Sequence, residues 1–205
     1  MKCIFLCGMG QRAKSWKAAA EHVPRQCFFP EIWENAGSPA VYDKIYSDFC
    51  RYAESFDEEL ILCGLSLGGI IAMQYCIENP CKVKGLVLAG VQHTMPKALL
   101  AFQNAVFSVL PQKVFDGTGF KKADFISLTK SMRDLTFKKE LSKINCPALV
   151  LSGERDRANI KACKETAELI KGAEFRVIEG AGHEINTQSP QKTGEALKDF
   201  VLQIV

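Results

Sequence analysis

Residues 60–69 read LILCGLSLGG, and the interpretation of the whole chain starts from this stretch. Its first four residues are apolar, which predicts a short strand buried on both faces. The turn Gly64-Leu65-Ser66-Leu67-Gly68 follows, and a helix-compatible segment continues to residue 78. In a G-x-S-x-G turn the glycines let neighbouring backbones approach closely while the chain reverses from strand to helix. The pattern predicts Ser66 as an exposed nucleophile; an ordinary glycine-rich turn is the alternative.

The same alternation of strand and helix extends in both directions from this turn. Short apolar runs predict strands at 2–7, 27–29, 60–63, 83–91, 147–152 and, more exposed, 174–178. Between them lie helix-compatible stretches near 12–22, 41–55, 67–78, 158–171 and 189–203. Strands that alternate with helices are typical of βαβ units. The expected fold class is therefore α/β, with a mostly parallel sheet of about six strands flanked by helices.

A serine nucleophile needs a base, and the chain has three histidines. His22 lies in a polar early helix and is expected at the surface. His93 follows the strand at 83–91, so it is a candidate for contact with a substrate. His183 follows the glycine-containing loop after the last strand, which favours it as the base.

The imidazole in turn needs a carboxylate to orient it. Glu154 and Asp156 both follow the strand at 147–152, on the sheet edge where Ser66 and His183 are expected. Their spacing from the strand does not decide which of the two carboxylates orients His183.

A developing oxyanion needs two N–H donors. Leu67 at the start of the predicted helix is one candidate. Met9, in the Gly8-Met9-Gly10 turn after the first strand, is the other; a plain strand-to-helix turn is the alternative.

Residues 97–143 interrupt the alternation and are expected to form a few short amphipathic helices inserted between two strands. They contain six of the thirteen Phe and carry a net charge of +5. One interpretation is a small helical cap with Phe102, Phe107 and Phe125 lining an apolar pocket. The other is a peripheral helical layer whose aromatic rings pack on the sheet. The positive charge could favour an anionic substrate, but a solvated helix face explains it as well.

Four motifs in this order resemble the α/β-hydrolase superfamily, in particular its small, compact, bacterial esterase-like members. They are the Gly8–Gly10 loop with Trp16 downstream, the serine turn, the segment 146–156, and Gly180-Ala181-Gly182-His183. The resemblance covers nearly the whole chain and implies the α/β-hydrolase fold with a cap at 97–143. It also implies a catalytic triad of nucleophile, base and acid, with backbone donors, at Ser66, His183, Asp156, Met9 and Leu67.

The chain departs from the family pattern in two ways. Cys7 precedes Gly8 where the family often has histidine. The first predicted strand corresponds to the third strand of the family, so we expect six strands rather than eight.

The resemblance implies a serine hydrolase that cleaves a small or medium, apolar carboxylic ester through an acyl-enzyme on Ser66. A thioesterase, a C–C hydrolase or a lyase would use the same triad. A ligand-binding module without catalysis is the alternative from another class. No metal cluster, phosphate-binding loop or dinucleotide fingerprint is present in the sequence, so no metal or cofactor is expected, and the expected partner is a small-molecule substrate.

Composition sets the remaining limits on the 205-residue chain. Its length predicts one domain over residues 1–205, and its net charge of +3 is too small to predict a nucleic acid or membrane partner. Its nine cysteines are odd in number and lie mostly in apolar runs. They predict unpaired thiols in a reducing compartment, the cytoplasm. Cys7 is the thiol whose modification we expect to disturb catalysis. The oligomeric state is not indicated.

Overall fold

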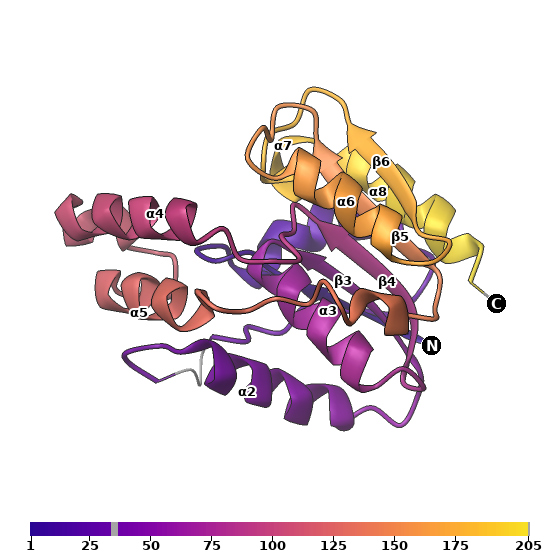
Figure 1. The fold of residues 1–205 in the computed structure, drawn as a ribbon. Helices are drawn as coiled ribbons and strands as arrows, with labels where there is room; N and C mark the ends of the chain where they lie inside the picture. The colour runs from indigo at the N-terminus through magenta and orange to yellow at the C-terminus, as the bar shows by residue number, and fades with distance from the viewer. Residues whose placement is uncertain (34–36, 205) are drawn as a thin grey trace.

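The computed structural model describes residues 1–33 and 37–204 and contains one six-stranded sheet (Figure 1). All strands are parallel, in the spatial order β2-β1-β3-β4-β5-β6. The expected α/β fold with a mostly parallel sheet of about six strands is confirmed. The strands are β1 (Lys2–Leu6), β2 (Cys27–Phe28), β3 (Leu60–Leu65), β4 (Val83–Ala89), β5 (Ala148–Gly153) and β6 (Glu174–Ile178).

Helices flank the sheet on both sides, which explains why its central strands are continuously apolar. Every residue of β3 and β5 is buried. Helix α3 packs on β3 and β4, α6 packs on β5 and β6, and α1 packs against α8. The helices of this layer arrangement are η1 (Ala13–Trp16), α1 (Lys17–Ala20), α2 (Tyr42–Glu54), α3 (Leu67–Glu78), α6 (Ile160–Leu169), α7 (Ile185–Gln188) and α8 (Pro190–Leu202).

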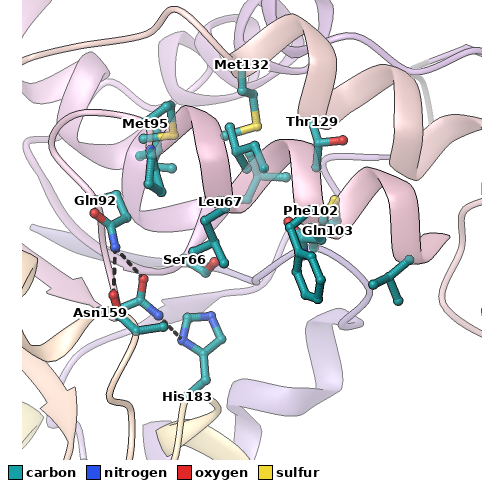
Figure 2. Close-up of a pocket in the computed structure, with 18 residues that line it drawn as sticks. Ser66, Leu67, Gln92, Met95, Phe102, Gln103, Thr129, Met132, Asn159 and His183 are labelled. Atoms are coloured by element: carbon teal, nitrogen blue, oxygen red, sulfur yellow. Dashed lines mark hydrogen bonds between the residues drawn. The ribbon is translucent and has the colours of Figure 1, made fainter. Parts of the chain in front are cut away.

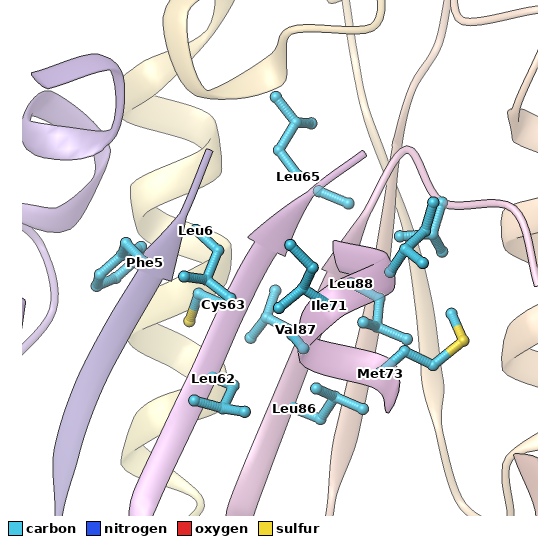
Figure 3. Close-up of a cluster of buried hydrophobic side chains, with 14 of the residues drawn as sticks. Phe5, Leu6, Leu62, Cys63, Leu65, Ile71, Met73, Leu86, Val87 and Leu88 are labelled. Atoms are coloured by element: carbon cyan, nitrogen blue, oxygen red, sulfur yellow. The ribbon is translucent and has the colours of Figure 1, made fainter. Parts of the chain in front are cut away.

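The hydrophobic core lies between the sheet and these helices (Figure 3). Leu62 and Leu86 on neighbouring strands and Ile71 on α3 are fully buried. Burying one such side chain stabilises the fold by about 1.5–3 kcal/mol. The core therefore fixes the strand ends from which the loops of the candidate site emerge.

The start of α8 shows how well a local signal predicts a boundary. Pro190 occupies the first helical turn, as the Ser189-Pro190 pair predicts. Ser189 stands at the N-cap position, but its side chain makes no capping hydrogen bond. The proline, with its fixed φ, therefore sets this boundary.

Residues 97–143, called the cap below, connect β4 to β5. They form α4 (Lys97–Val109), η2 (Gln112–Phe115), α5 (Lys122–Met132) and η3 (Leu141–Lys143). Helix α4 packs on α5, and α5 packs on α2. Figure 1 shows α4 and α5 side by side and projecting beyond the sheet. No residue of α4 is buried.

The cap has its own aromatic cluster and a narrow neck. The rings of Phe107, Phe115, Phe120 and Phe125 pack edge to face or tilted, with the centroids of contacting rings 4.9–5.7 Å apart. At the neck, Thr94 and Thr136 form an antiparallel bridge, and backbone hydrogen bonds on either side of it join the incoming and outgoing chains. The rings therefore stabilise the cap from within, and the neck joins the segment that enters the cap to the segment that leaves it.

No helix within residues 1–33 and 37–204 combines the length and the apolar character that a membrane span requires.

Candidate active site

Ser66 lies in a strained turn between β3 and α3. Its φ of 53° and ψ of −116° make it the one residue other than glycine with positive φ in the described part of the chain. A Cβ on Gly64 would lie 2.3 Å from the Gly68 carbonyl oxygen, and one on Gly68 would lie 2.4 Å from that of Leu6. Both positions therefore require glycine. A conformation of this kind costs about 1–3 kcal/mol and is found preferentially at functional sites.

His183 and Asp156 form a hydrogen-bonded pair after β6 and β5. Asp156 Oδ2 lies 2.7 Å from His183 Nδ1, and the aspartate side chain is only 4% exposed. A proton on Nδ1 is donated to this carboxylate, which leaves Nε2 unprotonated and able to accept a proton. Glu154, the other candidate, instead accepts a hydrogen bond from the backbone N–H of Gly180 at 2.9 Å. Of the two carboxylates, Asp156 is the one that contacts the imidazole.

The environment of Asp156 favours its ionised form. Burial by itself raises the pKa of this carboxyl group. Hydrogen bonds from His183 and Asn159 more than offset burial, so the pKa of Asp156 lies below its ordinary value. The carboxylate is therefore charged at neutral pH and can stabilise an imidazolium.

Ser66 and His183 line one cavity of about 410 Å³ (Figure 2). The Ser66 hydroxyl makes no hydrogen bond to His183 in the described structure. Such catalytic hydrogen bonds are often long without substrate and tighten when it binds. Gly90 leaves room for the imidazole: its φ is +56°, and a Cβ there would lie 2.9 Å from His183 Cε1.

The two expected oxyanion donors border the same cavity. Met9 and Leu67 both line it, and Leu67 is the first residue of α3, where backbone N–H groups lack partners within the helix. The loop that carries Met9 is held by Gln11, whose side-chain amide exchanges two hydrogen bonds with that of Asn186, at 3.1 and 3.2 Å. Since Asn186 follows His183 by three residues, this buried pair joins the Met9 loop to the His183 loop.

The cap supplies the apolar wall of the cavity. Helix α4 contributes Leu99, Leu100, Phe102 and Val106, and α5 contributes Met132. Phe102 lines the cavity while 68% exposed, so it borders the opening. Three methionines line the cavity, Met9, Met95 and Met132. Flexible thioether side chains of this kind adapt to ligands of different shape.

Three residues expected to contact a substrate lie elsewhere. Phe107 and Phe125 belong to the aromatic cluster inside the cap. Their rings contact each other, with centroids 5.4 Å apart, and neither residue lines the cavity. His93 is 5% exposed, and its Nδ1 lies 3.2 Å from the Thr166 hydroxyl on α6. Burial lowers the pKa of His93, which favours its neutral form. These three side chains have packing positions, and the expectation that they line the pocket is corrected.

Five amide side chains around the site were not expected from the sequence. Besides the pair Gln11 and Asn186, which holds the Met9 loop, they are Gln92 after β4, Gln103 on α4 and Asn159 before α6, and these three line the cavity. Asn159 donates to both oxygens of Asp156, and Gln92 donates to Asn159. The available signal is positional: Gln92 follows a strand at the edge where the catalytic candidates gather, and Asn159 follows Asp156 by three residues.

All nine cysteines are free thiols. Cys7 is buried, and its thiol donates a hydrogen bond to the Arg12 carbonyl oxygen at 3.1 Å. Burial, together with the nearby Glu31 carboxylate, raises the pKa of Cys7 to about 12. Since the thiolate is the reactive form, Cys7 is a poor target for oxidants and thiol reagents, contrary to the expectation from sequence. Within residues 1–33 and 37–204, no cluster of three metal-ligating side chains is present.

Comparison with known proteins gives one family for most of the chain. A sequence model of the family described as "Alpha/beta hydrolase family" matches residues 3–196. Monoacylglycerol lipase ABHD6 from Mus musculus is 21% identical over 163 residues, which cover 70% of this chain and 48% of the mouse protein. The chain thus spans about half the length of this curated relative.

Solved structures share the fold over almost the full chain. A thermophilic esterase from Thermogutta terrifontis superposes with a TM-score of 0.80 at 16% identity, covering 100% of this chain and 90% of the esterase. The enol-lactonase from Burkholderia xenovorans gives a TM-score of 0.78 at 17% identity, covering 98% and 91%. At these identities the structural likeness establishes the fold.

Proposed function

The chain belongs to the alpha/beta hydrolase family, and from this membership and the geometry of the cavity we propose that it is a serine hydrolase that cleaves a small or medium, apolar carboxylic ester. The observation that carries the proposal is the convergence of three features on one cavity. They are a strained serine turn, a His183–Asp156 pair in contact through Nδ1, and two segments with candidate N–H donors, the Met9 loop and the start of α3.

In the proposed reaction, Ser66 Oγ attacks the ester carbonyl carbon while His183 Nε2 accepts the hydroxyl proton. The N–H groups of Met9 and Leu67 donate to the resulting oxyanion; one such donor is typically worth about 10²–10³-fold in kcat. His183 then gives the proton to the leaving alcohol, which leaves an acyl group on Ser66. Water, deprotonated by His183, attacks the acyl-enzyme and releases the acid. Asp156 stabilises the imidazolium in both steps.

The cavity wall supports an apolar acyl or alcohol group as the main recognition element. Its volume of about 410 Å³ falls in the range typical of small-molecule pockets. The names of the relatives, a monoacylglycerol lipase and an esterase, favour ester cleavage. Lactone cleavage, the activity named for the Burkholderia structure, would use the same acyl transfer. We also propose that the protein works in a reducing compartment, the cytoplasm, since its nine cysteines are free thiols.

The first experiment asks whether Ser66 is an activated nucleophile. We expect a fluorophosphonate probe to label the protein and p-nitrophenyl esters to be hydrolysed. The Ser66→Ala variant should neither be labelled nor hydrolyse the esters, while its circular dichroism spectrum and melting temperature stay close to those of the wild-type protein. A folded wild-type protein that neither labels nor hydrolyses esters would favour the ligand-binding module instead.

A second experiment tests the cavity as the acyl site. Val106 lines the cavity, whereas Val109, three residues further along α4, is 80% exposed and does not line it. We expect Val106→Phe to reduce kcat/KM for long-chain esters about 10-fold more than for acetate, because the larger ring fills space that the chain needs. Val109→Phe is the matched control and should leave the chain-length profile unchanged. Equal profiles for both variants would exclude this wall from acyl recognition.

A further inference from the structure

Two side-chain amides, Gln92 and Asn159, form a chain of hydrogen bonds that ends on the Asp156 carboxylate. Figure 2 shows the contact between Gln92 and Asn159, with Asn159 beside His183. Asn159 Nδ2 lies 2.8 Å from Asp156 Oδ1 and 3.1 Å from Oδ2. His183 Nδ1 lies 2.7 Å from the same Oδ2 and 3.1 Å from Asn159 Nδ2. With its proton directed at the carboxylate, Nδ1 is not an acceptor for Asn159, so the hydrogen bonds of Asn159 go to Asp156. One carboxylate thus receives donors from both sides, and rotation about its Cβ–Cγ bond would break the contacts with Asn159 and with His183 together.

The orientation of the Asn159 amide follows from Gln92. Gln92 Nε2 lies 2.9 Å from Asn159 Oδ1 and 3.1 Å from the Ala158 carbonyl oxygen. Because both of these atoms are acceptors, the NH₂ group of Gln92 must face them. If the Asn159 amide were flipped, its oxygen would face the Asp156 carboxylate and its NH₂ would face the NH₂ of Gln92. Both contacts would be repulsive, so Gln92 selects the orientation in which Asn159 donates to Asp156.

The backbone around Asn159 adds to this arrangement. Its N–H donates to the Asp156 carbonyl oxygen at 3.1 Å, so the two residues share one tight turn before α6. Gln92 comes from the loop after β4, 67 residues earlier in the chain. The Gln92–Asn159 contact therefore links the loop after β4 to the loop that carries Asp156.

We propose that Asn159, oriented by Gln92, is a positioning residue that keeps the Asp156 carboxylate directed at His183. Asn159 acts through Asp156, and Gln92 acts through Asn159. This role rests on the proposed function, in which His183 is the base. Without Asn159, the carboxylate can turn away from Nδ1, and the imidazolium loses part of its stabilisation.

The variant that tests the proposal is Asn159→Leu, which keeps the size of the side chain and removes its donors. We expect kcat to fall about 10- to 100-fold, because a misplacement of about 1 Å at a catalytic group costs about 10²-fold in rate, with KM changed less than about threefold. Gln92→Leu should lower kcat less. The double variant should be no worse than Asn159→Leu alone, because both changes remove the same contact to Asp156.

A second measurement does not require turnover. In the Ser66→Ala background, the resonance of the His183 Nδ1 proton is followed by ¹H NMR. We expect Asn159→Leu to move this resonance upfield or to broaden it by exchange with water, because the proton is held in a charge-assisted hydrogen bond only while the carboxylate points at the ring. Asn79→Leu is the matched control: Asn79 also donates through Nδ2, to the Tyr75 carbonyl oxygen, at the far end of α3 from Ser66. It should leave the resonance and kcat unchanged.

The outcomes separate the proposal from the proposed function. A resonance that moves downfield would mean that Asn159 competes with His183 for the carboxylate, and an unchanged resonance would mean that it only fills space. Either result overturns the positioning role, as does a kcat within twofold of wild type in an active enzyme. If the wild-type protein neither hydrolyses esters nor reacts with fluorophosphonate, the proposed function fails, while the Nδ1 proton resonance still decides whether Asn159 directs Asp156.

Discussion

Replacing Gly90 with alanine should damage catalysis far more than it damages folding. Gly90 follows β4 with φ of +56°, and an added Cβ would lie 2.9 Å from Cε1 and 3.0 Å from Nδ1 of His183. Carbon atoms in good contact are about 3.5–4.0 Å apart. The imidazole must therefore move by about half an ångström or more, away from the position in which it contacts Asp156.

The two costs of Gly90→Ala can be worked out separately. Positive φ costs an L-residue about 1–2 kcal/mol, which lowers the melting temperature of a domain this size by about 2–8 °C. A misplacement of about 1 Å at a catalytic group costs about 10²-fold in rate. A displacement of half that distance or more should lower kcat about 10- to 100-fold.

Gly172→Ala is the matched control, because Gly172 has φ of +75° and its Cβ would meet nothing within 4 Å. It carries the same kind of backbone strain without the contact to His183. We would measure ester hydrolysis and thermal unfolding for both variants, correcting kcat for the folded fraction. The two should lose similar stability, and only Gly90→Ala should lose kcat. Equal kcat in the two variants would refute the reasoning that His183 needs the space above Gly90.

Three further predictions follow from the strained turn, the buried thiol and the buried carboxylate. Ser66→Gly should melt about 2–8 °C above Ser66→Ala, because glycine relieves about 1–2 kcal/mol of backbone strain; equal melting temperatures would show that the turn is unstrained. Iodoacetamide at about pH 8 should alkylate exposed Cys81 and spare Cys7, whose pKa is about 12, with activity retained; activity loss that tracks Cys7 labelling by mass spectrometry would contradict this. Asp156→Asn should be less stable than wild type in urea at neutral pH. The folded-state pKa of Asp156 is lowered, so its ionised carboxylate stabilises the folded state. This contribution to the free energy of unfolding is fully present above the unfolded-state pKa of about 3.9 and is lost as pH falls through the folded-state pKa. A difference that does not change with pH would rule out the charge as its source.

The sheet and the serine turn could be predicted because their signals are local. Four apolar residues before Gly64 indicate a buried strand, and the strained Ser66 requires glycines at fixed offsets. The predicted strand at 83–91 ends two residues late, since Gly90 leaves the sheet with positive φ. Boundaries of this kind depend on a single backbone angle, which periodicity does not report.

The side-chain environment could not be predicted, because it depends on contacts between distant segments. Spacing left Glu154 and Asp156 equivalent, and only the resemblance favoured the residue that contacts His183. Gln92 and Asn159 are 67 residues apart, and no local pattern marks their contact. Phe125 belongs to an aromatic-rich segment whose composition is the same whether its ring faces the cavity or its neighbours.

The narrow neck at Thr94 and Thr136 separates the cap from the sheet edge, so the ligand preference of the cavity can change in evolution independently of the residues at that edge. The groups proposed for bond cleavage leave the sheet edge, whereas α4 contributes to the cavity wall without burying any of its own residues. Mutations on α4 should therefore change the stability of the core little and should mainly change the contacts with a ligand in the cavity. Successive substitutions on α4 can therefore change which ligand the cavity prefers, while the residues proposed for bond cleavage stay the same.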